Sequence, residues 1–279
     1  METIIKISEI KPKILDWKKN DFVIGLVPTM GALHCGHESL IKKAKEICDK
    51  VVVSVFVNPI QFDPNEDYNI YPRTLEKDQE LCEKNGVDII FHPEISEMYP
   101  EKHITLVTPP DFYKNKLCGI TRKCHFDGVA TVVLKLFNIV QPDKAFFGQK
   151  DAQQLIIIKK LCRDLNVPVE IIGCPIIRDN DGLARSSRNQ YLSPEARQQA
   201  LCLNEILKTV KDLYNSGLRQ KKEIIDKALS KLRKGVEVEY LEVYDTLTLE
   251  ALDTLKPLSL VAIAAKVGNV RLIDNIIID

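Results

Sequence analysis

The chain has 279 residues, which is enough for one large α/β domain or two domains of ordinary size, and we expect two. Its 39 basic and 39 acidic side chains balance, so no global field draws the protein onto nucleic acid or an anionic membrane. Apolar residues make up 45% of the sequence but never form the uninterrupted run of about 18 that a transmembrane helix needs. The first residues lack the pattern of a secretory signal, and we expect a cytoplasmic protein.

Over the first two thirds of the chain, short apolar runs alternate with segments of helical period. The predicted strands are 22–27, 51–57, 87–91, 144–148 and 169–173. Continuous apolar runs of this length are typical of a parallel sheet that is buried on both faces. The alternation predicts a Rossmann-like, doubly wound α/β domain over residues 1–176.

The pattern changes from about residue 177. Ser193, Pro194 and Glu195 form a strong helix start, and the sequence after them predicts one long helix that Gly217 ends. A shorter helix and β-rich runs over 236–244, 259–267 and 271–279 follow. We therefore expect a smaller α+β C-terminal domain over residues 177–279.

The eight cysteines are scattered without a C-x-x-C pair, which indicates reduced thiols, most of them in the core. Cys118, Cys124 and His125 lie close together in sequence, but their spacing lacks a fourth zinc ligand. The sequence predicts no metal site formed by side chains.

Two histidines follow the first predicted core strand, in the segment TMGALHCGH. If a helix begins near Gly36, its free N–H groups form an anion site, and His34 and His37 beside it would neutralise charge on a phosphoryl group. The alternative is a pair of ordinary exposed histidines in a glycine-containing loop. A zinc site is a weaker alternative, because the H-E-x-x-H pattern is absent.

Polar residues also follow the second and fourth predicted strands. Asn58 and Gln61 offer neutral amides that suit a hydroxyl and a carboxylate, although Asn, Pro and Asp are also ordinary turn residues. Gly148 and Lys150 precede a helix with Gln153 and Gln154 in its first turn, so that Lys150 would reach phosphates. The alternative there is a helix start capped by Asp151.

At the proposed domain boundary lies DGLARSSRNQYLS, residues 181–193. Ser186, Ser187 and Arg188 supply two hydroxyls and a forked cation, which suit a polyphosphate and its transition state. The alternative is a polar interdomain hinge.

The order of these motifs is more specific than any one of them. Two histidines after the first strand, a basic loop late in the sheet domain and a Ser-Ser-Arg segment at the junction resemble the nucleotidyltransferase superfamily, with its H-x-G-H motif. Within it, the chain resembles the pantothenate synthetase (pantoate:β-alanine ligase) family up to about residue 200. The segments that carry the resemblance are PTMGALHCGHESLI, VVVSVFVNPIQF, DYNIYPRT, HFDGVATVVLKLFNIVQPDKAFFGQKDAQQL and DGLARSSRNQYLSPEAR.

The resemblance implies an enzyme that condenses (R)-pantoate with β-alanine, using ATP and Mg²⁺, through a pantoyl adenylate. It also implies a homodimer, and a C-terminal domain that covers the site on the ATP- and pantoate-binding domain. The implied catalytic residues are His34, His37, Lys150 and Arg188. The implied ATP contacts are Met30, Gly31, Ala32, Leu33, His34, Cys35, Gly36, His37, Gly148, Gln149, Lys150, Asp151, Ile177, Arg185, Ser186, Ser187 and Arg188.

For the other substrates, the resemblance implies that Gln61 binds pantoate and β-alanine and that Gln154 binds pantoate. Asn58 is a weaker candidate for substrate binding. Two places depart from the family pattern: Arg185 stands where Met is frequent, and residues 122–126 carry Lys and Cys where Pro and Gly are common. The first leaves open whether Arg185 binds phosphate or points into solvent, and the second puts the conformation of its loop in doubt.

Two other functions stay open on the sequence. One is an adenylyltransferase that acts on a phosphate acceptor, which would need more cations than the amides of Gln61 and Gln154 provide. The other is a nucleotide-sensing module without turnover, against which the five residues His34, His37, Lys150, Ser187 and Arg188 argue together.

Overall fold

The computed structural model describes residues 1–64 and 66–279, and the chain divides into two compact units. The first consists of residues 1–149 and 153–175, and the second of residues 150–152 and 176–279. Across the described residues, no helix combines the length and the apolar character that a membrane crossing requires.

The first unit contains a parallel sheet of six strands in the order β1-β4-β3-β2-β5-β6. Its strands are β1 (Glu2–Ile4), β2 (Ile24–Thr29), β3 (Lys50–Val55), β4 (Ile89–Phe91), β5 (Lys144–Gly148) and β6 (Glu170–Cys174). The helices are α1 (Ile7–Lys19), α2 (Cys35–Ile47), α3 (Leu75–Lys84), α4 (Ile95–Met98), α5 (Asp111–Lys114), α6 (Cys118–Thr121), α7 (His125–Val140) and α8 (Ala152–Asp164), with 3-10 turns η1 (Pro59–Gln61) and η2 (Gln149–Asp151). The predicted doubly wound parallel sheet is confirmed.

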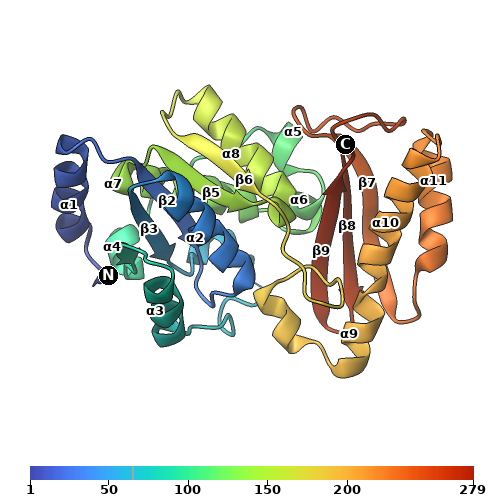
Figure 1. The fold of residues 1–279 in the computed structure, drawn as a ribbon, viewed down its shortest axis with the longest axis horizontal. Helices are drawn as coiled ribbons and strands as arrows, with labels where there is room; N and C mark the ends of the chain where they lie inside the picture. Colours follow the sequence, from blue (N-terminus) through green and yellow to red (C-terminus); the bar gives the residue numbers. More distant parts are fainter. Residues whose placement is uncertain (65) are drawn as a thin grey trace. The chain divides into compact units, whose positions relative to one another are not determined.

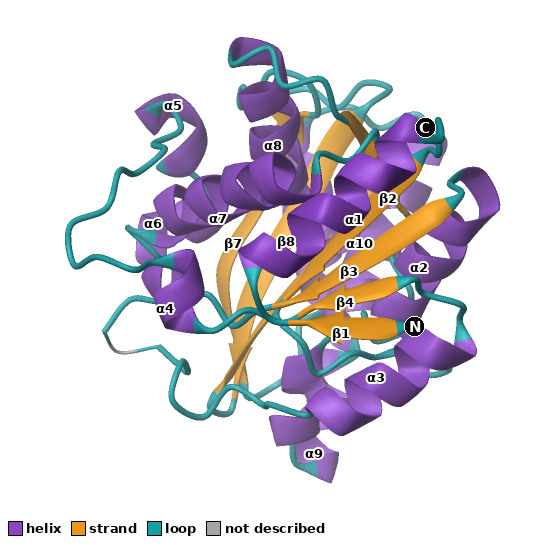
Figure 2. Ribbon diagram, turned by 90° about the vertical axis from the view of Figure 1, so that its left-hand side faces the viewer, coloured by secondary structure: helices purple, strands orange, loops and turns teal. Residues whose placement is uncertain are grey.

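Helices cover both faces of this sheet. Figure 2 shows α1, α7 and α8 on one side of the strands and α3 on the other. Successive residues of β3 pack on opposite faces of the sheet. Val52 packs into the hydrophobic cluster that includes α1, α7 and α8, whereas Val51 and Val53 pack into the cluster that includes α2. Side chains of a strand alternate between its faces, and this explains why the strands read as unbroken apolar runs.

The strand order reverses at β2, which pairs with β3 on one side and β5 on the other. In open α/β sheets a ligand crevice forms beyond the carboxyl ends of the strands at such a point. The loops that begin after β2, β3 and β5 are the three that carry the predicted polar residues of the first unit.

The second unit contains an antiparallel sheet, β7-β8-β9, made of β7 (Val236–Asp245), β8 (Ser259–Val267) and β9 (Val270–Ile277). Its helices are α9 (Pro194–Ala200), α10 (Cys202–Asn215) and α11 (Lys221–Ala228), with 3-10 turns η3 (Ser187–Tyr191) and η4 (Leu229–Lys231). Helix α10 packs on β8 and β9, with α11 beside it (Figure 1). The predicted smaller α+β fold is confirmed.

One helix prediction is wrong in this unit. The single helix expected from residue 193 to Gly217 is two helices, α9 and α10, which are interrupted at Leu201. Arg233 donates to the carbonyl of Gln198, the group that the N–H of Cys202 would use in a continuous helix. The break therefore depends on a side chain far along the sequence.

Candidate active site

The two histidines of the loop after β2 cap helix α2. The backbone N–H of Gly36 donates to Nδ1 of His34 (3.1 Å), and the N–H of His34 donates to Nδ1 of His37 (3.3 Å). His34 is the N-cap and His37 the third helical residue, so the pair forms a reciprocal capping box with imidazoles in place of the usual Ser and Glu. The two rings stack loosely, with centroids 4.1 Å apart.

This capping fixes the tautomer of both rings. A neutral imidazole has one N–H and one acceptor nitrogen, and Nδ1 is the acceptor in both His34 and His37. The proton therefore lies on Nε2, and each ring offers an Nε2–H donor at the positive end of the α2 dipole. Two donors at a helix N-terminus suit the oxygens of an anionic group.

A buried carboxylate holds the backbone of this loop. Asp78 of α3, which is 1% exposed, accepts the N–H of Ala32 (3.0 Å), the N–H of Leu33 (2.8 Å) and the hydroxyl of Thr74 (3.2 Å). Burial raises the pKa of Asp78, an effect that these donors partly oppose. The bonds stabilise Ala32 in a left-handed conformation (φ 50°), which is unusual for a residue with a Cβ.

Asn58 and Gln61, at the end of β3, lie side by side and buried. Nδ2 of Asn58 donates to Oε1 of Gln61 (3.0 Å) and to the carbonyl of Gly128 (3.1 Å). Nε2 of Gln61 donates to Sδ of Met30 (2.9 Å), which joins this pair to the loop after β2. The structure thus brings together Met30, Asn58 and Gln61, three of the predicted contacts.

The backbone of Gln61 is held from the other side by residues at the start of α7. Nδ1 of His125 donates to the carbonyl of Gln61 (3.0 Å), and Nε2 of His125 accepts from Nη1 of Arg122 (3.0 Å). Arg122 also pairs with the Glu66 carboxylate. The loop at 122–126, with Lys123 and Cys124 in place of the residues common in the family, thus anchors the turn that carries Gln61.

The two glutamines of the first turn of α8 differ in role. Gln153 is buried, where Oε1 accepts the N–H of Cys118 (3.0 Å) and Nε2 donates to the carbonyls of Tyr113 (2.9 Å) and Lys116 (2.7 Å). The amide of Gln154 makes no hydrogen bond to the residues that the structure describes, so it is available to a ligand. A Cβ added to Gly148 would meet none of those residues within 4 Å, which leaves open space beside β5.

Lys150 and Asp151 belong to the second unit, where Nδ2 of Asn275 in β9 donates to the carbonyl of Lys150 (2.9 Å). In the same unit, Arg185 pairs with Asp179 (3.1 Å), which also binds Arg197 (2.7 Å). Arg185 therefore forms an ion pair, while its side chain remains 37% exposed.

Other bonds shape the Ser-Ser-Arg segment itself. The backbone N–H of Arg185 donates to the carbonyl of Ile177 (2.9 Å), and Oγ of Ser186 accepts the N–H of Arg188 (3.3 Å) at the start of η3. Nearby in the sequence, Arg178 forms a bidentate ion pair with the buried Asp274 (2.6 and 2.9 Å). The segment with Ser187 and Arg188 thus has a defined backbone.

Comparison with known proteins decides the family. The family model of pantoate-β-alanine ligase matches residues 2–277. The chain belongs to the pantoate-β-alanine ligase family. It is 52% identical over 277 residues to the pantothenate synthetase of Clostridium botulinum (strain 657 / Type Ba4), covering 99% of this chain and 98% of that one. It is 51% identical over 277 residues to that of Ruminiclostridium cellulolyticum, with the same coverage.

Solved structures of the same family have the same fold. The pantothenate synthetase of Thermus thermophilus superposes with a TM-score of 0.92 at 39% identity, covering 99% of both chains. The pantoate-β-alanine ligase of Francisella tularensis, solved in complex with β,γ-ATP and β-alanine, superposes with a TM-score of 0.83 at 37% identity, covering 99% of this chain and 97% of that one.

The sequence did not predict four residues that contact the candidate site: Asp78, Tyr99, Arg122 and Gly128. Their partners lie between 41 and 70 positions away along the chain. Arg122 and Gly128 lie inside segments that resemble the family, but neither has a local pattern that reveals its contact.

Proposed function

We propose that this chain condenses (R)-pantoate with β-alanine, using ATP. In the first step a carboxylate oxygen of pantoate attacks the α-phosphorus, the bond to the bridging oxygen breaks, and pyrophosphate leaves with the electron pair. In the second step the β-alanine amine attacks the acyl carbon of the adenylate, loses a proton and expels AMP, which gives pantothenate. The proposal rests on the family membership over the whole chain.

The capping pair at the start of α2 is the observation that carries the first step. His34 and His37 each have their proton on Nε2, so both act as donors to phosphate oxygens as charge moves from the α-phosphate to the pyrophosphate. We assign them this electrostatic role and not that of a proton donor. The α2 dipole adds to the same stabilisation.

Pantoate would lie against neutral amides. Gln61 would contact pantoate and then β-alanine, Gln154 would contact pantoate, and Asn58 would act mainly by holding Gln61. Neutral donors orient the attacking carboxylate without forming the close ion pair that would lower its nucleophilicity. The buried position of Gln61 keeps water from competing for its amide.

ATP would lie along three segments, with Lys150 and Arg188 as the cations on its phosphates. These segments are Met30–His37 (Met30, Gly31, Ala32, Leu33, His34, Cys35, Gly36, His37), Gly148–Asp151 (Gly148, Gln149, Lys150, Asp151), and Ile177 with Arg185, Ser186, Ser187 and Arg188. Within the described part of the chain, no three His, Cys, Asp or Glu side chains gather as a metal site. Mg²⁺ would be held mainly by ATP oxygens and water, and we assign it no side chain.

An adenylyltransferase acting on a phosphate acceptor is not favoured. The full-length relatives at about 50% identity are named pantothenate synthetase, and the Francisella tularensis structure holds β-alanine with the ATP analogue. The side chains of Asn58 and Gln61 are neutral amides, whereas a phosphate acceptor calls for charged donors.

The test is ATP–pyrophosphate exchange with pantoate present and β-alanine absent. We expect wild type to exchange label only when pantoate is present, and His37→Ala to lose about 100-fold or more, because a preorganised donor to the developing charge is removed. Exchange that ignores pantoate but responds to a phosphate-bearing acceptor would instead establish the adenylyltransferase.

We also propose that the protein is a cytoplasmic homodimer. The family membership supports this proposal. Light scattering should give twice the chain mass of 31.7 kDa, and a mass of one chain would contradict it.

A further inference from the structure

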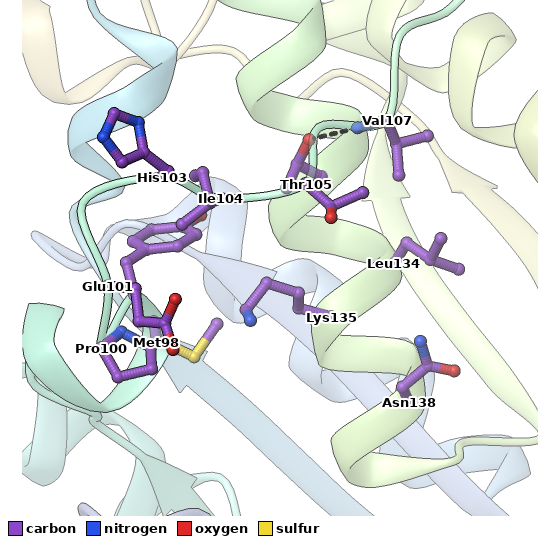
Figure 3. Close-up of a pocket in the computed structure, with 12 residues that line it drawn as sticks. Met98, Pro100, Glu101, His103, Ile104, Thr105, Val107, Leu134, Lys135 and Asn138 are labelled. Carbon is purple, nitrogen blue, oxygen red and sulfur yellow. Dashed lines mark hydrogen bonds between the residues drawn. The ribbon is translucent and has the colours of Figure 1, made fainter.

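Tyr99 lies between a cavity and the amide pair of the proposed pantoate site. Its side chain lines a cavity of about 340 Å³ between α7 and the segment 98–107, where Figure 3 shows Lys135 and Asn138 opposite Pro100 and Glu101. Asn58 and Gln61 do not line this cavity. The Tyr99 hydroxyl donates to Oδ1 of Asn58 (2.9 Å).

A backbone carbonyl fixes the direction of every hydrogen bond in this group. The carbonyl of Gly128 can only accept, so the nitrogen of the Asn58 amide must face it (3.1 Å) and the oxygen must face Tyr99. The second N–H of Asn58 then faces Gln61, so Oε1 of Gln61 must point inward as the acceptor (3.0 Å). The Nε2 donors of Gln61 are left to face the loop after β2.

In the structure, the partner of these donors is a weak one. Nε2 of Gln61 donates to the thioether sulfur of Met30, and a thioether is a poor acceptor on a flexible side chain. A carboxylate or hydroxyl oxygen would replace it with a gain in hydrogen-bond energy. The Gln61 amide is therefore oriented before any substrate arrives.

We propose that Tyr99 is a positioning residue that, through Asn58, orients the Gln61 amide so that its N–H donors face pantoate. This inference rests on the proposed function, in which Gln61 is the pantoate ligand. Tyr99 itself touches no substrate.

The chemistry of Tyr99 suits this task. Burial raises the pKa of its phenol above the usual range, so the hydroxyl keeps its proton and remains a donor over the whole working pH range. Lys135 lies over the ring, 5.5 Å from its centroid, and holds it from the cavity side. Tyr99→Phe keeps the ring and removes only the donor, which leaves the buried Oδ1 of Asn58 without this hydrogen bond and weakens the hold of Asn58 on the Gln61 amide.

The experiment is a double-mutant cycle of Tyr99→Phe and Gln61→Ala, read as kcat and KM for pantoate and for ATP. We expect Tyr99→Phe to raise the pantoate KM by about tenfold, the loss of one well-oriented hydrogen bond, with the ATP KM unchanged. In the Gln61→Ala background, Tyr99→Phe should have no further effect, because the amide that it orients is gone.

If the Gln61→Ala variants turn over too slowly, the same comparison is made on pantoate dissociation constants from ligand-observed NMR. Tyr214→Phe, which removes a phenol hydroxyl from the core of the second unit, is the matched control and should leave all constants unchanged. Equal effects of Tyr99→Phe with and without Gln61, or equal rises in both KM values, would overturn the inference. Absence of pantoate turnover in wild type would instead defeat the proposed function.

Discussion

At the scale of single residues, Asp78 decides the shape of the histidine loop. Its carboxylate accepts two consecutive backbone N–H groups, from Ala32 and Leu33, and so holds the chain that leads into the cap of α2. Any other residue at Gly31 would be strained, because Gly31 has a φ of 82° and a Cβ would lie 3.0 Å from the Asp78 carboxylate. The conformation of the histidine loop therefore depends on α3 as much as on the loop itself.

The first prediction concerns Asp78→Asn, which turns one acceptor into a donor that faces a backbone N–H. We expect a loss of about 1–3 kcal/mol in the free energy of unfolding and a higher ATP KM. Because burial raises the folded-state pKa of Asp78, the folded protein gains stability as pH falls through that pKa toward the unfolded value, and the Asn variant does not. In urea titrations the gap between the two proteins should therefore widen as pH falls from 7 toward about 4.

The control is Thr74→Val, which removes the hydroxyl donor to Asp78 and keeps the carboxylate. It should cost less than the Asn variant and leave the ATP KM near wild type. A gap between wild type and Asp78→Asn that narrows at low pH would contradict the assigned direction of the pKa.

The second prediction concerns Cys35, the first residue of α2. Among the eight cysteines, only Cys35 and Cys124 are exposed, and burial raises the pKa of the Cys82 thiol to about 12 and that of Cys48 to about 11. Iodoacetamide at pH 7.5 should therefore modify Cys35 and Cys124 first, as peptide mass spectrometry would show. ATP should protect Cys35 and leave Cys124 reactive, and equal protection of both would argue against nucleotide at the α2 terminus.

At the scale of elements, the close approach of α7 to the turn η1 holds the amides of Asn58 and Gln61 in place. A Cβ added at Gly128 would lie 2.5 Å from the carbonyl oxygen of Ile60 and 2.6 Å from the Gln61 backbone. Only glycine permits this contact, and the same residue gives Asn58 its acceptor. The helix and the turn therefore form one rigid support for Gln61.

The third prediction is that Gly128→Ala displaces η1 from α7, because both clashing groups are backbone. We expect a destabilisation of about 1–3 kcal/mol and a pantoate KM that rises more than the ATP KM. Gly173→Ala in β6 is the matched control: its Cβ would meet only the flexible end of Leu155, and it should cost less and leave pantoate binding unchanged. Equal effects of the two variants on the pantoate KM would contradict the conclusion that the contact between α7 and η1 supports Gln61.

How much the sequence could predict follows from the range of each contact. The strands β2 to β6 and the pair His34 and His37 could be predicted, because apolar runs and an N-terminal helix signal are local. Strand β1 has only one buried residue, Ile4, and so lacks a continuous apolar run. The break between α9 and α10 depends on Arg233, so neither feature has a local pattern. The roles of Asp78 and Tyr99 in the site depend on partners more than 40 positions away, which no spacing reveals.

At the scale of the whole molecule, each unit has its own hydrophobic core. The functional assignment of the two domains, 1–176 for ATP and pantoate and 177–279 as a cover for the site, stays a prediction. These separate cores do predict that damage to one unit remains largely within it.

The fourth prediction tests this with Arg178→Met, which leaves the buried carboxylate of Asp274 without its cation. We expect a cost of about 3 kcal/mol, together with faster hydrogen exchange in β9 and the 177–191 segment. Exchange in β2 and β3 should stay as in wild type. Gly128→Ala should give the reverse pattern, and acceleration of both sheets by either variant would show that the units unfold together.

The bond from Asn275 to the carbonyl of Lys150 joins groups that are 125 positions apart in the chain. A ribosome adds roughly 5–20 residues per second, so Asn275 is synthesised on the order of ten seconds after Lys150, and this hydrogen bond cannot form earlier. The sheet of the first unit is complete in sequence by residue 174, long before then. The nascent protein therefore passes through an interval in which the α/β sheet can form while the segment with Lys150, which we propose to bind phosphate, still lacks its anchor in β9.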